Sequence, residues 1–476
     1  MKKTKIVCTI GPATNSVETL KKMIEAGMNV ARINFSHGSM EEQIGFINNV
    51  KMAREELGVP VALLLDTQGP EIRTGALKTD TVELVDGNYF TLKVEDIEGD
   101  ENAVSISYKE LYKDVKFGDS ILIDDGKIEL LVEKIEGTDI VCRVADGGIL
   151  GKRKSINVPD SVINLPGLNE KDIKDITDGI RENFDYISAS FIRTADDVRA
   201  IRKLLDENGG KDVKIISKIE SRQGIENFNE ILKLSDGIMV ARGDMGVEIP
   251  LEEVPMYQKE FIKACNRAGK LVITATQMLE SMTNSTRPTR AEVSDVANAI
   301  YDGTGAIMLS GESASGKYPV ECVNTMVRIA NVIENDINYW GRFDNLNYDP
   351  KKMNYEFNLN RSVCLTAEEM SAKAIVAYTE GGDTPKQIAS FMPNCPVYAI
   401  TTSEKTYRQL SLAFDTYPVL VEKKDDVKEM MAEGIKKLEE KGLLKQDDII
   451  VISGGGSVLE VGAKKMNRNI GGIMKI

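Results

Sequence analysis

The most informative absence in this chain of 476 residues is histidine, which occurs once. A Ser-His-Asp or Cys-His catalytic arrangement would have only His37 to use, and a metal site built from several histidines is excluded. Any chemistry must therefore rest on carboxylates, lysines, arginines and hydroxyls, with or without a metal ion.

The cysteines indicate neither a disulfide framework nor a zinc site. There are six, scattered along the chain without a C-x-x-C pair, which is typical of free thiols in a reducing compartment. The opening segment MKKTKIVCTIGP has too short an apolar run for a signal peptide, and no apolar segment is long enough to span a bilayer. We therefore expect a cytoplasmic protein without a membrane partner.

The chain also lacks the basic excess that a nucleic-acid partner favours. Lys and Arg total 60 against 74 acidic residues, so the net charge is −14. A surface this acidic repels phosphate backbones, although it leaves room for a local basic pocket that binds a small phosphate ligand. Hydrophobic residues make up 42% of the chain, which is enough for the cores of two or three domains.

What the chain does contain is an apolar run followed by a helical pattern, repeated eight times. Such continuous Val, Ile, Leu and Met runs are expected for parallel strands that are buried on both faces. Eight βα units predict a closed (β/α)₈ barrel, with an open doubly wound sheet as the alternative. The predicted strands are 5–10, 30–34, 61–66, 186–191, 213–220, 237–244, 271–276 and 306–312.

Capping residues mark the helices between these strands. Ser39 with Glu42, and Thr194 with Asp197, have the spacing of a capping box at a helix start. Glycine is the residue that most often ends a helix. We expect helix ends at Gly27, Gly58, Gly210 and Gly269.

The count of eight requires a long insertion after the third strand. Between about 70 and 163 the pattern changes to short alternating runs, and the Asp-Gly pairs at 86–87 and 125–126 predict hairpins. We predict a small inserted β-barrel domain here, and a separate α/β domain after the barrel. The predicted domains are the barrel over 1–69 and 164–338, the insertion over 70–163, and the C-terminal domain over 339–476.

Polar residues stand at nearly every predicted strand end, where a (β/α)₈ barrel carries its functional groups. Lys218 and Glu220 alternate with Ile219, so both side chains point to the same side of their strand, with a structural ion pair as the alternative. The strand-end residues are Thr9, Arg32, Asn34, Ser36, Asp66, Thr67, Ser190, Lys218, Glu220, Asp244, Thr276, Ser310 and Glu312.

The segment Gly243-Asp244-x-Gly246 follows the sixth predicted strand. We expect a tight turn whose backbone N–H groups hold a carboxylate or phosphate while Asp244 points into the barrel mouth. An ordinary Asx-type turn is the alternative. Together with Glu220, Asp244 forms the pair of carboxylates that commonly holds Mg²⁺, with substrate oxygens and water completing the coordination.

A second group of oxygens contains one carboxylate and several neutral donors, from Asn34, Ser36, Asp66 and Thr67. This set suits a cation of low charge, and a simple hydrogen-bond network is an equal alternative.

Four basic residues, Arg32, Arg73, Lys154 and Lys218, can face phosphate groups, although each alone is ordinarily a surface charge. Two phosphates at about 4 Å repel by about 4 kcal/mol per pair of unit charges at an effective dielectric of 20. An array of cations that offsets this repulsion indicates phosphoryl transfer.

Seven segments then identify a family. They are RINFSHG, LLDTQGPEIRTG, ISASFIR, ISKIES, GIMVARGDMGVEIP, TATQMLESM and MLSGESASGKYP, in this order. Together they resemble pyruvate kinase, strongly over the barrel and insertion and more loosely over the C-terminal domain. The resemblance implies transfer of a phosphoryl group from phosphoenolpyruvate to ADP, which yields pyruvate and ATP in glycolysis, with Mg²⁺ (or Mn²⁺) and K⁺ as cofactors. It also implies a homotetramer.

The resemblance assigns roles to the strand-end residues. It implies catalysis by Lys218, Arg32, Arg73 and Thr276, and substrate binding by Arg32, Lys218, Ser190, Gly243, Asp244 and Thr276. It implies Mg²⁺ ligands at Glu220 and Asp244, K⁺ ligands at Asn34, Ser36, Asp66 and Thr67, and nucleotide contacts at Asn34, His37, Arg73 and Lys154.

The chain departs from the family pattern at two places. Gln68 replaces the usual lysine, whereas Glu71 fits the K⁺-dependent branch. The segment TEGGDTPKQ resembles the family's phosphate-effector loop, but its acidic Asp383 argues against a sugar bisphosphate. Two alternatives remain open: another Mg²⁺-dependent barrel enzyme acting on pyruvate or its enolate, and a catalytically inactive metabolite sensor.

Overall fold

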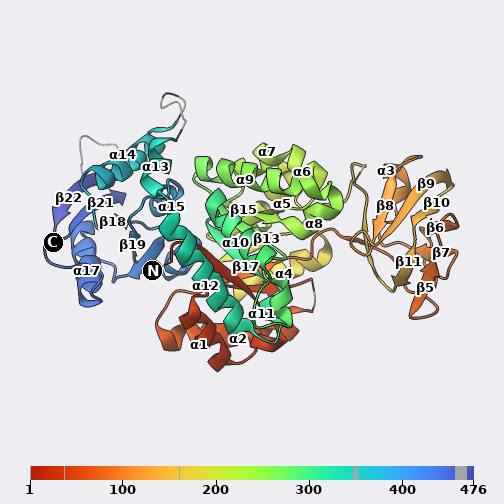
Figure 1. Ribbon diagram of the computed structural model, residues 1–476, viewed down its shortest axis with the longest axis horizontal. Helices are drawn as coiled ribbons and strands as arrows, with labels where there is room; N and C mark the ends of the chain where they lie inside the picture. Colours follow the sequence, from red (N-terminus) through yellow and green to blue (C-terminus); the bar gives the residue numbers. More distant parts are fainter. Residues whose placement is uncertain (1, 37, 160, 347–350, 352, 456–468) are drawn as a thin grey trace.

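The protein is described by a computed structural model that covers residues 2–36, 38–159, 161–346, 351, 353–455 and 469–476. Figure 1 shows a central barrel between two smaller domains. The barrel is closed by eight parallel strands in the order β1-β17-β16-β15-β14-β13-β3-β2, so the predicted fold is confirmed and the open sheet was wrong. The strands are β1 (Lys5–Ile10), β2 (Val30–Asn34), β3 (Ala62–Asp66), β13 (Tyr186–Ala189), β14 (Lys214–Ile219), β15 (Gly237–Ala241), β16 (Leu271–Ala275) and β17 (Ala306–Leu309).

Both faces of each barrel strand are buried, which explains the continuous apolar runs. In β1, Ile6 and Cys8 belong to the apolar cluster under the surrounding helices, whereas Val7 belongs to the cluster inside the barrel. The barrel helices are α1 (Val17–Ala26), α2 (Met40–Leu57), α4 (Glu170–Arg181), α5 (Ala195–Glu207), α6 (Arg222–Glu226), α7 (Phe228–Leu234), α8 (Arg242–Glu248), α9 (Val254–Ala268), α10 (Arg290–Asp302), α11 (Gly311–Ala314) and α12 (Pro319–Asp336), with 3₁₀ turns η1 (Pro12–Thr14), η2 (Leu251–Glu253) and η3 (Glu280–Thr283).

The helix boundaries largely follow the capping residues. Ser39 and Thr194 each close a capping box, so both predicted starts are confirmed. The end predicted at Gly210 was wrong, because α5 already ends before Asn208 and the positive φ of 82° falls on Gly209. The helix ends at Gly27, Gly58 and Gly269 are confirmed.

The tight turn expected at Gly243-Asp244-x-Gly246 was also wrong. The strand β15 stops at Ala241, and these residues form the short helix α8 instead. The first N–H groups of a helix have no partner within the helix, so the segment still presents backbone donors.

The insertion builds its own sheet around a separate apolar core. Seven strands follow the order β4-β12-β8-β9-β10-β6-β7, and a bridge between Thr74 and Ile106 joins the segments next to the two edge strands, which curls the sheet. The elements are β4 (Ile72–Arg73), β5 (Thr81–Leu84), β6 (Tyr89–Lys93), β7 (Ala103–Ser105), α3 (Leu111–Asp114), β8 (Ser120–Ile123), β9 (Ile128–Glu136), β10 (Asp139–Asp146), β11 (Gly148–Gly151) and β12 (Ser155–Asn157).

Of the two hairpins predicted in the insertion, one is present. The pair at 125–126 joins the antiparallel strands β8 and β9. The pair at 86–87 connects strands that do not pair, since β5 pairs with β11 and β6 with β10. Asp86 accepts a hydrogen bond from the backbone N–H of Gly147, which ties this turn to β11 rather than to a hairpin.

The C-terminal domain has a five-stranded sheet in the order β20-β19-β18-β21-β22. The first four strands are parallel and alternate with helices, in agreement with the predicted α/β domain. The fifth, β22, is antiparallel, and its two glycines weaken the strand pattern in the sequence. The elements are α13 (Tyr339–Asp344), α14 (Tyr355–Glu369), β18 (Ala374–Tyr378), α15 (Asp383–Ser390), β19 (Val397–Thr401), α16 (Glu404–Gln409), η5 (Leu410–Leu412), β20 (Thr416–Leu420), α17 (Val427–Glu440), β21 (Ile449–Gly455) and β22 (Asn469–Lys475).

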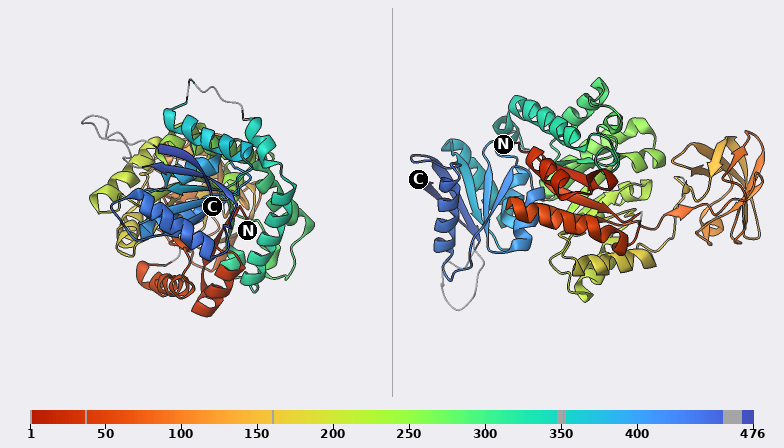
Figure 2. Two further views of the ribbon diagram at one scale, coloured as in Figure 1. Left: turned by 90° about the vertical axis from the view of Figure 1, so that its left-hand side faces the viewer. Right: turned by 90° about the horizontal axis from the view of Figure 1, so that it is seen from below.

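This domain covers the end of the barrel that lies opposite the insertion (Figure 2). Leu410 and Leu412 join the apolar cluster inside the barrel, and the hydroxyl of Tyr186 donates to the carbonyl of Gln409 over 2.6 Å. Among the described residues, no helix has both the length and the apolar composition to cross a membrane.

An ion pair between Asp185 and Arg408 links the barrel to the C-terminal domain. The carboxylate of Asp185 is fully buried and accepts from Arg408 Nε, at 3.0 Å, and from the backbone N–H of Leu63. Burial raises the pKa of Asp185, and the charge of Arg408 opposes that rise.

We predict that Arg408→Met lowers the free energy of unfolding by about 3–5 kcal/mol, because it leaves a buried carboxylate without its cation. The double variant Asp185→Asn/Arg408→Met should recover part of this loss in urea unfolding. As a control, Lys22→Met removes an exposed ion pair with Glu18 and should leave the urea midpoint nearly unchanged, because solvent screens such a pair. A double variant as unstable as Arg408→Met would contradict the expectation.

Candidate active site

The rim of the barrel that faces the insertion carries the strand-end residues. A cavity of about 100 Å³ lies there between the two domains. The insertion domain lines one side of the cavity with Glu71 and Asn157. The barrel lines the other side with Phe191, Asp244 and Val247. The site is therefore shared by two domains.

Lys218 lies at the centre of a buried polar cluster below this cavity. Its side chain leaves β14 and is 11% exposed. The ammonium donates to Ser190 Oγ over 2.8 Å and lies 2.9 Å from Glu220 Oε1 and 3.6 Å from Asp66 Oδ2. A single cation thus joins residues from three strands.

The charges in this cluster strongly influence one another. Burial alone would lower the pKa of Lys218, but Asp66, Glu220 and Asp244 outweigh burial and raise it above its ordinary value. Burial raises the pKa of Glu220; the charge of Lys218 opposes that rise and Asp244 adds to it. Lys218 is therefore held as a cation, whereas Glu220 lacks sufficient positive charge around it.

Arg32 supplies the second cation of the cluster. Its guanidinium donates to Asp66 Oδ2 over 2.5 Å and to Thr9 Oγ1 over 2.7 Å. Burial would raise the pKa of Asp66, but Arg32 and Lys218 bring it below the ordinary value. Asp66 Oδ1 is buried and has no hydrogen-bond partner among the described residues, which leaves an acceptor for a cation.

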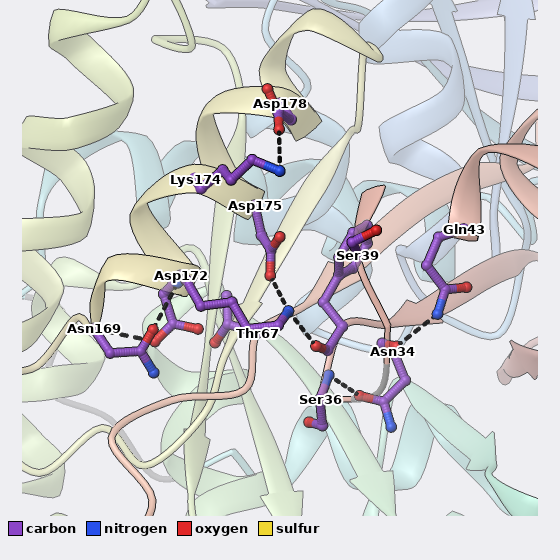
Figure 3. A network of polar contacts seen from close by, with 12 residues as sticks. Asn34, Ser36, Ser39, Gln43, Thr67, Asn169, Asp172, Lys174, Asp175 and Asp178 are labelled. Carbon is purple, nitrogen blue, oxygen red and sulfur yellow. Dashed lines mark hydrogen bonds and ion pairs between the residues drawn. The ribbon is translucent and has the colours of Figure 1, made fainter. Parts of the chain in front are cut away.

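The loops after β2 and β3 bring the neutral oxygens close to Asp66. Asn34 Oδ1 accepts from the N–H of Ser36 over 3.1 Å, and Ser190 Oγ donates to the carbonyl of Thr67 over 2.7 Å. Figure 3 shows these loops facing side chains from the first turns of α4, including Asp172 and Asp175.

The helix α4 holds both loops in place. The ammonium of Lys171 bridges the carbonyl of Phe35, at 2.7 Å, and the carboxylate of Asp175, at 2.5 Å. Asn169 and Asp172 bond to the carbonyl and the N–H of Gly69. The oxygens therefore sit on a preorganised frame.

Thr276 and the start of α8 form the opposite side of the rim. The N–H of Gly243 donates to Thr276 Oγ1 over 2.7 Å, so the ends of β15 and β16 are joined directly. A β-carbon at Gly243 would lie 3.3 Å from the same oxygen, and glycine therefore allows this close approach. The carboxylate of Glu312 accepts hydrogen bonds from the backbone N–H groups of Leu279 and Ser310, so this strand-end residue supports the backbone of the rim.

Two predicted residues remain on the insertion side, away from Lys218. Arg73 donates to Glu71 over 2.7 Å and to the carbonyl of Arg153 over 3.1 Å. Lys154 pairs with Asp124 over 2.9 Å. His37 lies outside the described residues.

The donors present fit a divalent ion held by two carboxylates. Among the described residues, no group of three or more His, Cys, Asp and Glu side chains is placed to hold a metal by itself. The charge of Asp244 raises the pKa of Glu220, so a cation near both carboxylates would relieve this repulsion. An ion bound there needs further ligands from a substrate, as Mg²⁺ commonly does.

Sequence reasoning missed two contacts at this site. Arg242 donates to the carbonyl of Thr276, and Asn157 of the insertion donates to Glu248 of α8 over 2.8 Å. The position of Arg242 immediately after the strand GIMVA was a sequence signal for its contact. The contact between Asn157 and Glu248 joins residues 91 positions apart, and no sequence signal indicated it.

Comparisons with known proteins agree with this geometry. The family model for the pyruvate kinase barrel domain matches residues 1–323, and the model for the pyruvate kinase alpha/beta domain matches residues 358–468. Pyruvate kinase from Clostridium acetobutylicum is 49% identical over 96% of each chain. Pyruvate kinase from Clostridium perfringens is 47% identical, again over 96% of each chain.

A solved structure extends the similarity to three dimensions. The crystal structure of a pyruvate kinase from Cryptosporidium parvum superposes with a TM-score of 0.93 at 37% identity, over 100% of this chain and 96% of that one. With family models that match both the barrel and the C-terminal domain, and relatives this similar over nearly their whole length, the chain belongs to the pyruvate kinase family of phosphotransferases.

Proposed function

We propose that the chain transfers the phosphoryl group of phosphoenolpyruvate to ADP in glycolysis, yielding pyruvate and ATP, with Mg²⁺ (or Mn²⁺) and K⁺ as cofactors. The observation that carries the proposal is the buried ammonium of Lys218, which lies between Ser190, Glu220 and Asp66 at the rim below the insertion. Moving a phosphoryl group between two anions depends mainly on positioning and charge neutralisation, which this cluster offers.

In this proposal Lys218 and Arg32 bind the phosphoryl group. Both cations are buried and already share Asp66, so a phosphoryl oxygen can replace part of their carboxylate contacts. Glu220 and Asp244 would hold Mg²⁺, which would supply further positive charge to offset the repulsion of the anionic substrates. Ser190 orients Lys218 by accepting its hydrogen bond.

We assign the monovalent cation to Asn34, Ser36, Asp66 and Thr67. The buried Oδ1 of Asp66 without a partner and the neutral oxygens on the α4-braced loops support this assignment. K⁺ prefers such a set of mostly neutral oxygens to the two carboxylates on the other side of Lys218.

The three-carbon part of the substrate lies between α8 and the end of β16. Backbone N–H groups in the first turn of α8 bind its carboxylate: Asp244 donates to it directly, and Gly243 shares its N–H between the carboxylate and Thr276 Oγ1. Thr276 lies beside the carbon that is protonated, and its hydroxyl holds the water that supplies the proton.

The nucleotide binds on the insertion side of the cavity. We assign Arg73, Lys154, Asn34 and His37 to this contact. Arg73 and Lys154 are paired with Glu71 and Asp124, so nucleotide binding requires them to exchange these partners as the insertion closes over the barrel.

The proposal includes a homotetramer in the cytoplasm. All six cysteines are free and buried, which suits a reducing compartment. We propose the domain boundaries as 1–69 and 164–338 for the barrel, 70–163 for the insertion and 339–476 for the C-terminal domain.

The first prediction concerns the reaction itself. In an assay coupled to lactate dehydrogenase, the chain should form pyruvate from phosphoenolpyruvate only when both ADP and Mg²⁺ are present, and EDTA should stop the reaction. Turnover that does not need ADP would instead favour a lyase or aldolase, and an absence of product would favour a sensor.

The second prediction concerns the monovalent cation. Replacing K⁺ by choline at constant ionic strength should strongly reduce kcat, because Asp66 Oδ1 and its neighbouring oxygens would lose the ion that fills their site. Full activity in a buffer with choline or Na⁺ alone would remove K⁺ from the proposal.

The third prediction concerns Lys218. Lys218→Met should lower kcat by about 10²–10³-fold or more, because one preorganised charge at a transition state is worth that much. Lys214→Met is the matched control, since Lys214 lies at the other end of the same strand and pairs only weakly, at 3.9 Å, with Asp236. A variant with kcat near that of the control would exclude Lys218 from the mechanism.

A further inference from the structure

Thr276 and Gln277 adopt an unusual backbone conformation at the rim. Their φ angles are +69° and +53°, so two successive residues with side chains occupy the left-handed region. The left-handed conformation is unfavourable for residues with a β-carbon, which then lies too close to the following carbonyl oxygen. Such a pair persists only where the surroundings hold it, and strained positions of this kind gather at functional sites.

Arg242 supplies the contacts that hold this turn. Its Nε donates to the carbonyl of Ala275 over 3.1 Å, and its Nη2 donates to the carbonyl of Thr276 over 2.6 Å. The left-handed turn directs these two successive carbonyls to one side, where a single planar guanidinium reaches both. Lysine cannot reproduce this fork, because it has one nitrogen.

The guanidinium is itself fixed from the other side. Its Nη1 lies 2.6 Å from Asp295 Oδ1 on α10, and the arginine side chain is only 12% exposed. Gln258 on α9 offers a further acceptor to Nη1, at 3.4 Å. Arg242 therefore connects two barrel helices to the strained turn and has little freedom to move.

The same contacts determine where the hydroxyl of Thr276 lies. This hydroxyl donates to the carbonyl of Ala275, which Arg242 also holds, and it accepts from the N–H of Gly243, the residue next to Arg242. A hydroxyl has one proton and two lone pairs, so one lone pair remains for a water molecule. One of the two partners that orient this hydroxyl, the carbonyl of Ala275, is therefore itself held by Arg242, and the other belongs to the adjacent residue of the same helix turn.

We propose that Arg242 is a positioning residue for the proton-transfer step, acting through Thr276. The inference rests on the function proposed above. In this step the enolate carbon forms a C–H bond with a proton from the water held by Thr276; the O–H bond of that water breaks, and solvent returns the proton. Arg242 does not touch the reacting atoms, and it keeps the water at the right distance from the enolate.

The test compares the exchange of pyruvate methyl hydrogens for solvent deuterium with overall turnover. Exchange is followed by proton NMR with ATP, Mg²⁺ and K⁺ present. Arg242→Lys should slow exchange and kcat by about 100-fold, the typical effect of a displacement of about 1 Å at a reacting centre, and should change KM for phosphoenolpyruvate less. Adding Thr276→Ala should then cost far less than it does in the parent chain, because both changes remove the same placement.

Arg202→Lys is the matched control. Arg202 also binds two backbone carbonyls, of Lys211 and Val213, and one aspartate, Asp236, but it lies away from the rim. The Arg202→Lys variant should have a lower melting temperature, but its rate of exchange of the pyruvate methyl hydrogens should be unchanged. If Arg242→Lys does not fold, Asp295→Asn decides the question, since it loosens the guanidinium without removing its carbonyl bonds and should slow exchange several-fold.

Two results would overturn the inference. One is normal exchange in Arg242→Lys or, if that variant does not fold, in Asp295→Asn. The other is full additivity of Arg242→Lys with Thr276→Ala. Failure of the proposed function is separate, because it would appear in the parent chain as an absence of pyruvate formation from phosphoenolpyruvate and ADP.

Discussion

Closure of eight parallel strands into a ring brings the C-terminal end of every strand to the same rim, and the rest of the site depends on this constraint. Asp66 and Ser190 come from strands other than that of Lys218. Both nevertheless lie within ion-pair or hydrogen-bond distance of the Lys218 ammonium. Because this rim faces the insertion, the cluster lies below a cavity shared by two domains. The opposite end of the barrel is closed by the C-terminal domain and serves stability.

The charge balance at the rim explains why it suits anionic substrates and cations together. Two buried cations, Lys218 and Arg32, share Asp66, and Glu220 is left beside Asp244 with its pKa raised. Buried charges of this kind are costly unless they are paired. Under the proposed function, these buried cations would bind a phosphoryl group and the two carboxylates would bind a metal ion.

Rigid elements hold this cluster on two sides. The first turns of α4 hold the loops that carry Asn34 and Thr67, and Arg242 holds the turn at Thr276. The insertion contacts the rim through polar bonds such as that from Asn157 to Glu248. The geometry of the polar cluster is therefore fixed by contacts within the barrel, and the proposed nucleotide site lies on the insertion side.

The sequence by itself determined the number of barrel strands, the residues at their ends and five of the six helix boundaries predicted from capping residues, because apolar runs and capping residues are local signals. It could not show that Gly243 lies in the first turn of a helix, or that the turn at 86–87 joins strands with different partners. Both features depend on contacts with distant residues such as Thr276 and Gly147. The arginine directly after the strand GIMVA, Arg242, was a signal in the sequence, but its partners could not be predicted. Only the tertiary structure brought that guanidinium to the carbonyls at 275–276, since a long side chain can reach in many directions and packing selects one.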